Sequence, residues 1–215
     1  MTVRAKICGI NDAQALDAAV AHGASYVGFV FYPRSPRYLA PSAAGALARR
    51  APAGVVRVGL FVDVDDQGIE AILKEAPLDM LQFHGAEPPE RIRATKARLG
   101  LPVMKAIKIG SAPDLEWADR FGDSADWLLF DAKVPATMTG ALPGGNALSF
   151  DWQLLSGARI ALPWMLSGGL TSANVAEAVR TSGAQVVDVS SGVEDRPGHK
   201  DPGRIAEFLR VVRSL

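Results

Sequence analysis

The sequence predicts an α/β fold, a single (β/α)8 barrel, on three observations. Short runs of β-branched and aromatic residues recur along the chain, and each is followed by a polar turn and an Ala- and Leu-rich amphipathic segment. Most of these runs are apolar throughout, which is typical of parallel strands covered on both faces. Eight such units, each of roughly 25 residues, fit a 215-residue chain, near the lower end of the range for these barrels. A doubly wound open sheet is the alternative, but it rarely has eight such regular units.

Eight segments are expected to be strands because they are short, rich in β-branched or aromatic residues and bounded by polar turns. They are residues 3–7, 26–31, 55–62, 80–84, 103–109, 127–131, 164–167 and 186–190. The segments between them have helical character, with Asp65 and Thr171 fit to cap a helix and Gly23, Gly100 and Gly183 fit to end one. The expected helices are residues 11–22, 42–50, 65–75, 88–99, 114–120, 151–156, 171–181 and 201–213.

Composition excludes several classes of protein. Basic and acidic residues number 23 each, so nothing indicates binding to the phosphate backbone of a nucleic acid. No stretch approaches the ~18 consecutive apolar residues of a membrane-spanning helix, and the N-terminus, with Arg4 and Lys6, does not resemble a signal peptide. Cys8 is the only cysteine, so it cannot form an intramolecular disulfide. We expect a cytoplasmic protein with one domain, residues 1–215, and no nucleic-acid or membrane partner.

Polar residues at the carboxyl ends of the expected strands are the candidates for chemistry, because barrels of this kind build their sites there. Cys8 ends the first strand, His84 the fourth and Asp131 the sixth. Purely structural roles also stay open. Cys8 can be a small buried apolar residue, His84 a donor to a backbone carbonyl, and Asp131 a cap at the end of its strand. Asp188 lies inside the eighth strand, where a carboxylate needs a partner. We expect Arg37 to supply it across the barrel mouth.

The loops after the seventh and eighth strands indicate a phosphate ester as ligand. Gly168 and Gly169 allow backbone N–H groups to approach a bound group closely. The stretch Ser190, Ser191 and Gly192 repeats this arrangement with two hydroxyl groups added. Loops after these two strands frequently bind phosphate in such barrels.

The segment from Lys133 to Trp152 is longer than the other connections and is rich in Gly, Pro and Thr. A long irregular segment in a compact domain is usually functional or disordered. Because it springs from the strand that bears Asp131, we expect a lid that excludes water from the site, with a plain surface excursion as the alternative.

Several motifs together resemble one known family. "KICGI", "GFVFYPRSPRY", "VGLFVD", "LQFHG", "LLFDA", "FDW", "LSGGL" and "VDVSSGVE" occur in the order and spacing of phosphoribosylanthranilate isomerase of tryptophan biosynthesis, through nearly the whole chain. The resemblance implies a (β/α)8 barrel without cofactor or metal. It implies an Amadori rearrangement of a phosphosugar substrate, N-(5-phosphoribosyl)anthranilate, to 1-(o-carboxyphenylamino)-1-deoxyribulose 5-phosphate.

The resemblance also implies residue roles. Cys8 matches the general base, Asp131 the general acid, and Arg37 a residue that orients the substrate at the anthranilate end together with Asp188. His84 matches a further site residue. The matches to the phosphate loops are Gly168, Gly169, Ser190, Ser191 and Gly192.

This chemistry requires a protonated acid and an ionised base at the same time. We therefore expect burial to keep a proton on Asp131 near neutral pH and the site to favour the thiolate of Cys8.

The chain departs from the family pattern in the long segment. Many relatives read Gly-Gly-Thr/Ser-Gly-Lys-x-Phe-Asp-Trp, whereas this chain reads "GGNALSFDW", with Asn146 in place of the hydroxyl residue and no lysine. Any lid contact that involves those side chains in the family, within residues 133–149, is therefore in question here.

Two other functions stay open. The related isomerase of histidine biosynthesis has an aspartate pair at the two catalytic strand ends, where this chain has Cys8 at the first. A barrel that binds a phosphorylated metabolite without converting it would share the phosphate loops, and only an activity measurement distinguishes it. Whether the protein is a monomer or a homodimer is also open.

Overall fold

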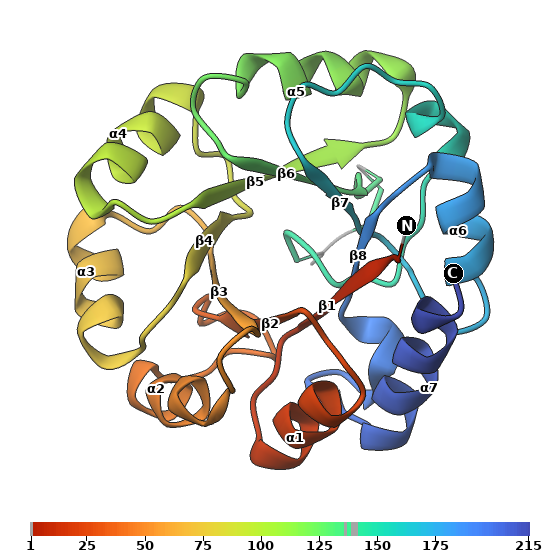
Figure 1. Ribbon diagram of the computed structural model, residues 1–215. Helices are drawn as coiled ribbons and strands as arrows, with labels where there is room; N and C mark the ends of the chain where they lie inside the picture. Colours follow the sequence, from red (N-terminus) through yellow and green to blue (C-terminus); the bar gives the residue numbers. More distant parts are fainter. Residues whose placement is uncertain (1, 136, 139–141) are drawn as a thin grey trace.

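The computed structural model describes residues 2–135, 137, 138 and 142–215. Within them, the strands β1 to β8 form a closed parallel barrel with helices around its outside (Figure 1). The predicted fold class is confirmed, and each strand overlaps its expected segment. The strands are β1 (Arg4–Cys8), β2 (Tyr26–Val30), β3 (Val56–Phe61), β4 (Met80–Phe83), β5 (Val103–Ile109), β6 (Trp127–Ala132), β7 (Trp164–Leu166) and β8 (Val186–Val189).

The register of the strands determines which side chains meet inside the barrel. Lys6 of β1 pairs with Asp188 of β8, and Cys8 of β1 pairs with Gly28 of β2. Because successive residues of a strand point to opposite faces, Lys6 and Cys8 point inward and Ile7 points outward. Ile7 is fully buried in the large apolar core between the strands and the helices.

A second apolar cluster fills the barrel near the amino ends of the strands. It includes Tyr26, Met80 and Met104. The guanidinium group of Arg4 lies over the rings of Tyr26 and Trp127, 5.6 Å and 5.8 Å from their centroids. This packing closes the barrel at the amino ends of the strands. A ligand therefore enters at the carboxyl ends.

The helices differ from the expected ones mainly after β5 and β6. The segment expected as a helix over residues 151–156 forms only the 3₁₀ turn η2 (Trp152–Leu155), and that prediction is wrong because Gly157, with φ +71°, follows too soon for an α-helix. The expected helix over 114–120 begins as 3₁₀ helix η1 (Ala112–Leu115) before α5. The α-helices of the described residues are α1 (Ala13–Ala21), α2 (Pro41–Arg50), α3 (Asp66–Glu75), α4 (Pro89–Leu99), α5 (Glu116–Arg120), α6 (Val175–Ser182) and α7 (Pro202–Arg213).

A small hairpin that the sequence did not predict lies between β8 and α7. The 3₁₀ turn η3 (Ser191–Val193) leads into β9 (Glu194–Arg196), which pairs antiparallel with β10 (His199–Lys200). Gly198 has φ +81°, and its carbonyl accepts a 2.7 Å hydrogen bond from Asn11 Nδ2, which ties the hairpin to the loop after β1. None of the described helices is both long and apolar enough to cross a membrane.

Candidate active site

An open cavity lies at the carboxyl ends of the barrel strands. Most of the predicted site residues line it. Gly192 does not, because a Cβ there would lie 1.9 Å from the Leu170 carbonyl oxygen, which shows that it packs against the loop after β7. The predicted residues in the lining are Cys8, Arg37, His84, Asp131, Gly168, Gly169, Asp188, Ser190 and Ser191.

Cys8 points into this cavity from the end of β1 and is 4% exposed. Its neighbour in register is Gly28, where a Cβ would lie 3.1 Å from Cys8 Sγ. A side chain at that position would crowd the sulfur, so Gly28 makes the room that the thiol occupies. Burial raises the pKa of the Cys8 thiol, and the charge of Lys6 works in the opposite direction. The expectation that the site favours the thiolate is therefore not met at rest.

The partner of Asp188 is Lys6, and the predicted pair of Asp188 with Arg37 is wrong. Lys6 Nζ donates to Asp188 Oδ1 at 2.8 Å, and Ser167 Oγ donates to Asp188 Oδ2 at 3.0 Å. The register of β1 and β8 places Lys6 beside Asp188 within the barrel, so a lysine of the neighbouring strand neutralises this carboxylate.

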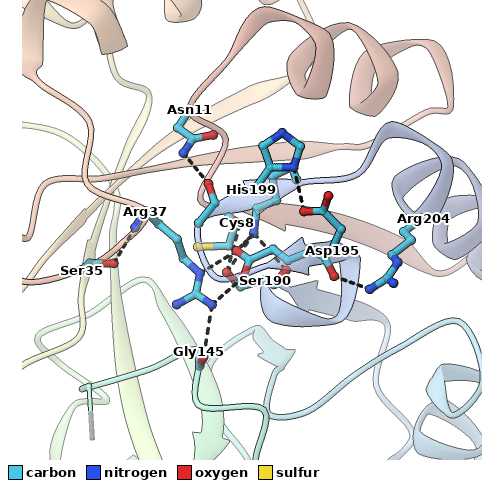
Figure 2. Close-up of polar contacts among 12 residues, drawn as sticks. Cys8, Asn11, Ser35, Arg37, Gly145, Ser190, Asp195, His199 and Arg204 are labelled. Atoms are coloured by element: carbon cyan, nitrogen blue, oxygen red, sulfur yellow. Dashed lines mark hydrogen bonds and ion pairs between the residues drawn. The ribbon is translucent and has the colours of Figure 1, made fainter. Parts of the chain in front are cut away.

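Arg37 instead pairs with Glu194, from the hairpin that the sequence did not predict (Figure 2). Its Nε and Nη2 donate to the two Glu194 carboxylate oxygens at 2.7 Å and 2.8 Å, a bidentate geometry that fixes the guanidinium plane. Lys200 Nζ donates to Glu194 Oε1 at 2.7 Å and to Ser190 O at 2.9 Å. Ser190 Oγ in turn donates to the Cys8 backbone carbonyl at 3.1 Å, and Figure 2 shows Arg37, Cys8 and Ser190 close together.

Asp131 is at the other side of the cavity, in contact with Lys108 and His84. Lys108 Nζ donates to Asp131 Oδ2 at 2.7 Å, and His84 Nε2 lies 3.1 Å from the same oxygen. Burial acts to raise the pKa of Asp131, but the charge and the hydrogen bond of Lys108 hold it well below its usual range. The expectation that burial alone keeps Asp131 protonated is therefore wrong for the resting site.

His84 is neutral in this arrangement, because burial and the nearby Lys108 charge lower its pKa. Its Nδ1 lies 3.0 Å from Gln82 Nε2, and its Nε2 lies 2.6 Å from Lys108 Nζ. An ammonium group can only donate, so Nε2 accepts from Lys108 and the ring proton is on Nδ1. The proton on Nδ1 needs an acceptor, and the buried amide oxygen of Gln82, which has no other hydrogen-bond partner among the described residues, supplies it when it faces the ring.

The glycines after β7 are in left-handed conformations that other residues rarely adopt. Gly168 has φ +91° and Gly169 has φ +61°. Neither backbone N–H donates to an acceptor within the described residues, so both are available to a ligand. A Cβ on Gly169 would also lie 2.9 Å from Leu148, so this glycine has a packing role as well.

The described part of the long segment lies over the mouth of the cavity, where residues 142–148 form part of the lining. The Gly145 carbonyl accepts a 3.2 Å hydrogen bond from Arg37 Nη2. Asn146 closes its own turn, because its side chain accepts from Leu142 N at 3.1 Å and donates to Leu142 O at 2.7 Å. Residues 136 and 139–141 of the predicted lid lie outside the described residues.

Four charged residues of the site were missed by the sequence analysis: Lys6, Lys108, Glu194 and Lys200. Lys6 and Lys108 had a readable signal, since each is an inward-facing lysine in a mainly apolar strand segment. Glu194 and Lys200 had no such signal, because only the hairpin of β9 and β10 brings them next to Arg37 and to each other.

Comparisons with known proteins agree on one family. Residues 5–211 match the family profile of N-(5'-phosphoribosyl)anthranilate (PRA) isomerase. The chain is 58% identical over 215 residues to N-(5'-phosphoribosyl)anthranilate isomerase of Rhodospirillum centenum, covering all of both chains. It is 54% identical over 213 residues to the enzyme of Paramagnetospirillum magneticum, covering 99% of this chain and 98% of that one.

Solved structures give the same result. Phosphoribosyl anthranilate isomerase from Thermotoga maritima is similar with a TM-score of 0.88 and 36% identity over the full length of both chains. A complex of such an isomerase with reduced 1-(o-carboxyphenylamino)-1-deoxyribulose 5-phosphate is similar with a TM-score of 0.86 and 35% identity, again over both full chains. By the family match, these identities and the shared barrel, the chain belongs to the N-(5'-phosphoribosyl)anthranilate isomerase family.

Proposed function

We propose that Cys8 and Asp131 are the base and the acid with which this isomerase converts N-(5'-phosphoribosyl)anthranilate to 1-(o-carboxyphenylamino)-1-deoxyribulose 5-phosphate. One observation carries the assignment. Cys8 and Asp131 point into the same cavity from the carboxyl ends of β1 and β6, on different sides of the barrel. A sugar ring between them is within reach of a group on each side.

The reaction needs one proton donated and one removed. Asp131 protonates the ring oxygen while the nitrogen lone pair breaks the C1–O bond, which leaves a protonated Schiff base. The Cys8 thiolate then removes the C2 proton, and the electron pair of that C–H bond forms a C1=C2 bond as the nitrogen becomes neutral. The enolamine that results tautomerises to the ketone.

The resting protonation states are the reverse of those the reaction uses. Lys108 keeps Asp131 ionised, and burial keeps Cys8 as a thiol. The productive pair, protonated Asp131 with ionised Cys8, holds the same number of protons as the resting pair. It is therefore a minor tautomer whose fraction is independent of pH between the two pKa values.

The glycine loops are the proposed site for the substrate phosphate. The N–H groups of Gly168 and Gly169 lack acceptors within the described residues, and both glycines line the cavity. Ser190 and Ser191 face them from the end of β8. Neutral amide and hydroxyl donors at this end of a barrel suit a phosphate ester.

Arg37 is the proposed contact for the anthranilate carboxylate. Glu194 occupies Nε and Nη2, and Gly145 O takes a second bond from Nη2, so Nη1 is the nitrogen without an acceptor among the described residues. Arg37 lines the cavity, and a guanidinium N–H is a strong donor to a carboxylate. Glu194 thus orients the guanidinium group and leaves Nη1 for the substrate carboxylate.

The test is to add N-(5'-phosphoribosyl)anthranilate to the purified protein and to follow the loss of its fluorescence. We expect turnover, and we expect it to be lost in Cys8→Ser and Asp131→Asn. Binding of the compound without turnover would contradict the proposal and would favour a barrel that binds a phosphorylated metabolite without converting it.

A further inference from the structure

Lys6 is a fully buried lysine on the inner face of β1, two residues before Cys8. Residues two apart in a strand point to the same side, so its ammonium group and the Cys8 sulfur both point into the barrel. A Cβ on Gly28 would lie 3.2 Å from Lys6 Nζ and 3.1 Å from Cys8 Sγ, so both atoms border the same small space.

Lys6 has more hydrogen-bond donors than its pair with Asp188 uses. Its ammonium group has three N–H donors. Asp188 Oδ1 accepts one of them at 2.8 Å, and the Cys8 sulfur is close enough to interact with the ammonium group as well. Asp188 is itself shared, because Ser167 Oγ donates to its other oxygen. A buried cation with spare donors is costly unless another negative group lies nearby. A thiolate at Cys8 is such a group.

We propose that Lys6 is the positioning residue for the base, and that its ammonium group, held by Asp188, is the counter-charge of the Cys8 thiolate. This inference rests on the proposed role of Cys8 and extends it. Lys6 thereby compensates for the burial of the thiolate, and Asp188 limits how much of that positive charge reaches the sulfur.

Other charged groups face Cys8 from the neighbouring elements. Lys6 and Lys200 lower the pKa of its thiol, whereas burial and Asp188 raise it. Gly28, its neighbour on β2, contributes no charge. Arg37 and Glu194 pair with each other beside it, and His84 and Asp131 line the same cavity. Lys6 has a larger effect than Lys200, which Glu194 already neutralises.

The alternative is that Lys6 and Asp188 are only a structural pair inside the barrel. The two accounts predict opposite effects of Lys6→Met on the reactivity of Cys8, and the same direction for Asp188→Asn. If Lys6 is the counter-charge, Lys6→Met makes the thiol harder to ionise, and Asp188→Asn makes it easier because Lys6 is then free to face the sulfur. If the pair is only structural, either change loosens the barrel and exposes Cys8, so both speed its reaction with a reagent.

The experiment measures Cys8 without substrate. Cys8 is the only cysteine, so the rate of alkylation by iodoacetamide between pH 6 and pH 10 reports its thiolate fraction alone. The absorbance of the thiolate at 240 nm, against Cys8→Ser as blank, gives the same titration without a reagent. At pH 8 we expect alkylation about tenfold slower or more in Lys6→Met, and several-fold faster in Asp188→Asn.

Lys105→Met is the matched control. Lys105 is also buried and paired with a buried carboxylate, Glu87 at 2.8 Å, but it does not line the cavity and is not among the charges that act on the Cys8 thiol. Its substitution should leave the thiol titration unchanged.

An unchanged or faster reaction in folded Lys6→Met, or an unchanged or slower one in Asp188→Asn, would overturn the proposal. Where Lys6→Met does not fold, the double variant Lys6→Met/Asp188→Asn removes both charges together. Because Lys6 has the larger effect of the two, this variant should still react more slowly than the wild type, and an equal or faster rate would also overturn it. Failure of the proposed function shows up separately, as turnover by Cys8→Ser.

Discussion

Lys108 Nζ lies 2.7 Å from Asp131 Oδ2, so the proposed acid forms an ion pair with a lysine from the neighbouring strand. The two residues are partners in the register of β5 and β6. His84 Nε2 also lies within 2.6 Å of the same ammonium group. The charge state of the proposed acid is therefore set by a residue that does not line the cavity itself.

Lys108→Met should lower the free energy of unfolding by about 1–3 kcal/mol at pH 7, because it leaves Asp131 buried without its charged donor. The pKa of Asp131 is lower in the folded protein than in the unfolded chain, so the pair stabilises the fold above the unfolded pKa. That contribution is lost as the pH falls through the folded pKa. The difference between wild type and variant should thus shrink toward acid pH.

Urea unfolding at several pH values from 7 down to about 2 measures this, because the contribution declines only below the unfolded pKa of Asp131, about 3.9. Lys96→Met is the control, because the pair of Lys96 with Asp126 is more exposed and should contribute little. A stability difference for Lys108→Met that stays constant with pH would contradict the interpretation of the Asp131 ion pair.

The pH dependence of kcat/KM should be flat over a wide range, because the productive pair is a minor tautomer of fixed fraction between the two pKa values. Burial raises the pKa of Cys8, so the basic limb should lie above the ordinary thiol value of about 8.5. Cys8→Asp should move this limb to lower pH, since a carboxylate ionises well below a thiol. A two-limbed profile unchanged in Cys8→Asp, with activity retained, would mean that Cys8 is not the titrating base.

Gly169→Val should raise KM for the phosphorylated substrate and destabilise the protein. The residue has φ +61°, and a Cβ there would lie 2.9 Å from Leu148 of the lid segment. Gly157→Val is a matched control, because Gly157 has φ +71° but no atom within 4 Å of its Cβ position. Steady-state kinetics with circular dichroism separates the two effects, and an equal KM in the two variants would argue against a phosphate site at Gly169.

Asn146→Ala should raise KM several-fold with a smaller effect on kcat. The side chain holds the turn of the lid segment through both an acceptor and a donor bond to Leu142, and the next residue back, Gly145, bonds Arg37. Asn146→Asp keeps the acceptor and loses the donor, so it should fall between wild type and Asn146→Ala. Identical kinetics in all three would show that this turn has no part in substrate binding.

The barrel was predictable because apolar strand segments, polar turns and amphipathic helices recur with little variation. Cys8, His84 and Asp131 were found for the same reason, since the fold makes the ends of the strands meet at one mouth. The pairing of Asp188 with Lys6 was not predictable. The two residues are far apart in the sequence, and only the register of β1 and β8 places them side by side.

The charge state of Asp131 could not be predicted from the sequence either. Burial alone predicts a protonated Asp131, but Lys108 reverses that outcome, and its approach depends on the register of β5 and β6. The Glu194 partner of Arg37 depends on the hairpin of β9 and β10, whose strands of three and two residues are too short to produce a readable pattern.

The most direct test of the central claim is the turnover of N-(5'-phosphoribosyl)anthranilate by Cys8→Ser. A hydroxyl group is far harder to ionise than a thiol, so a folded variant that still binds substrate should lose about a hundredfold or more of kcat. A folded Cys8→Ser enzyme with nearly wild-type kcat would contradict the account, because the C2 proton would then be removed by another group.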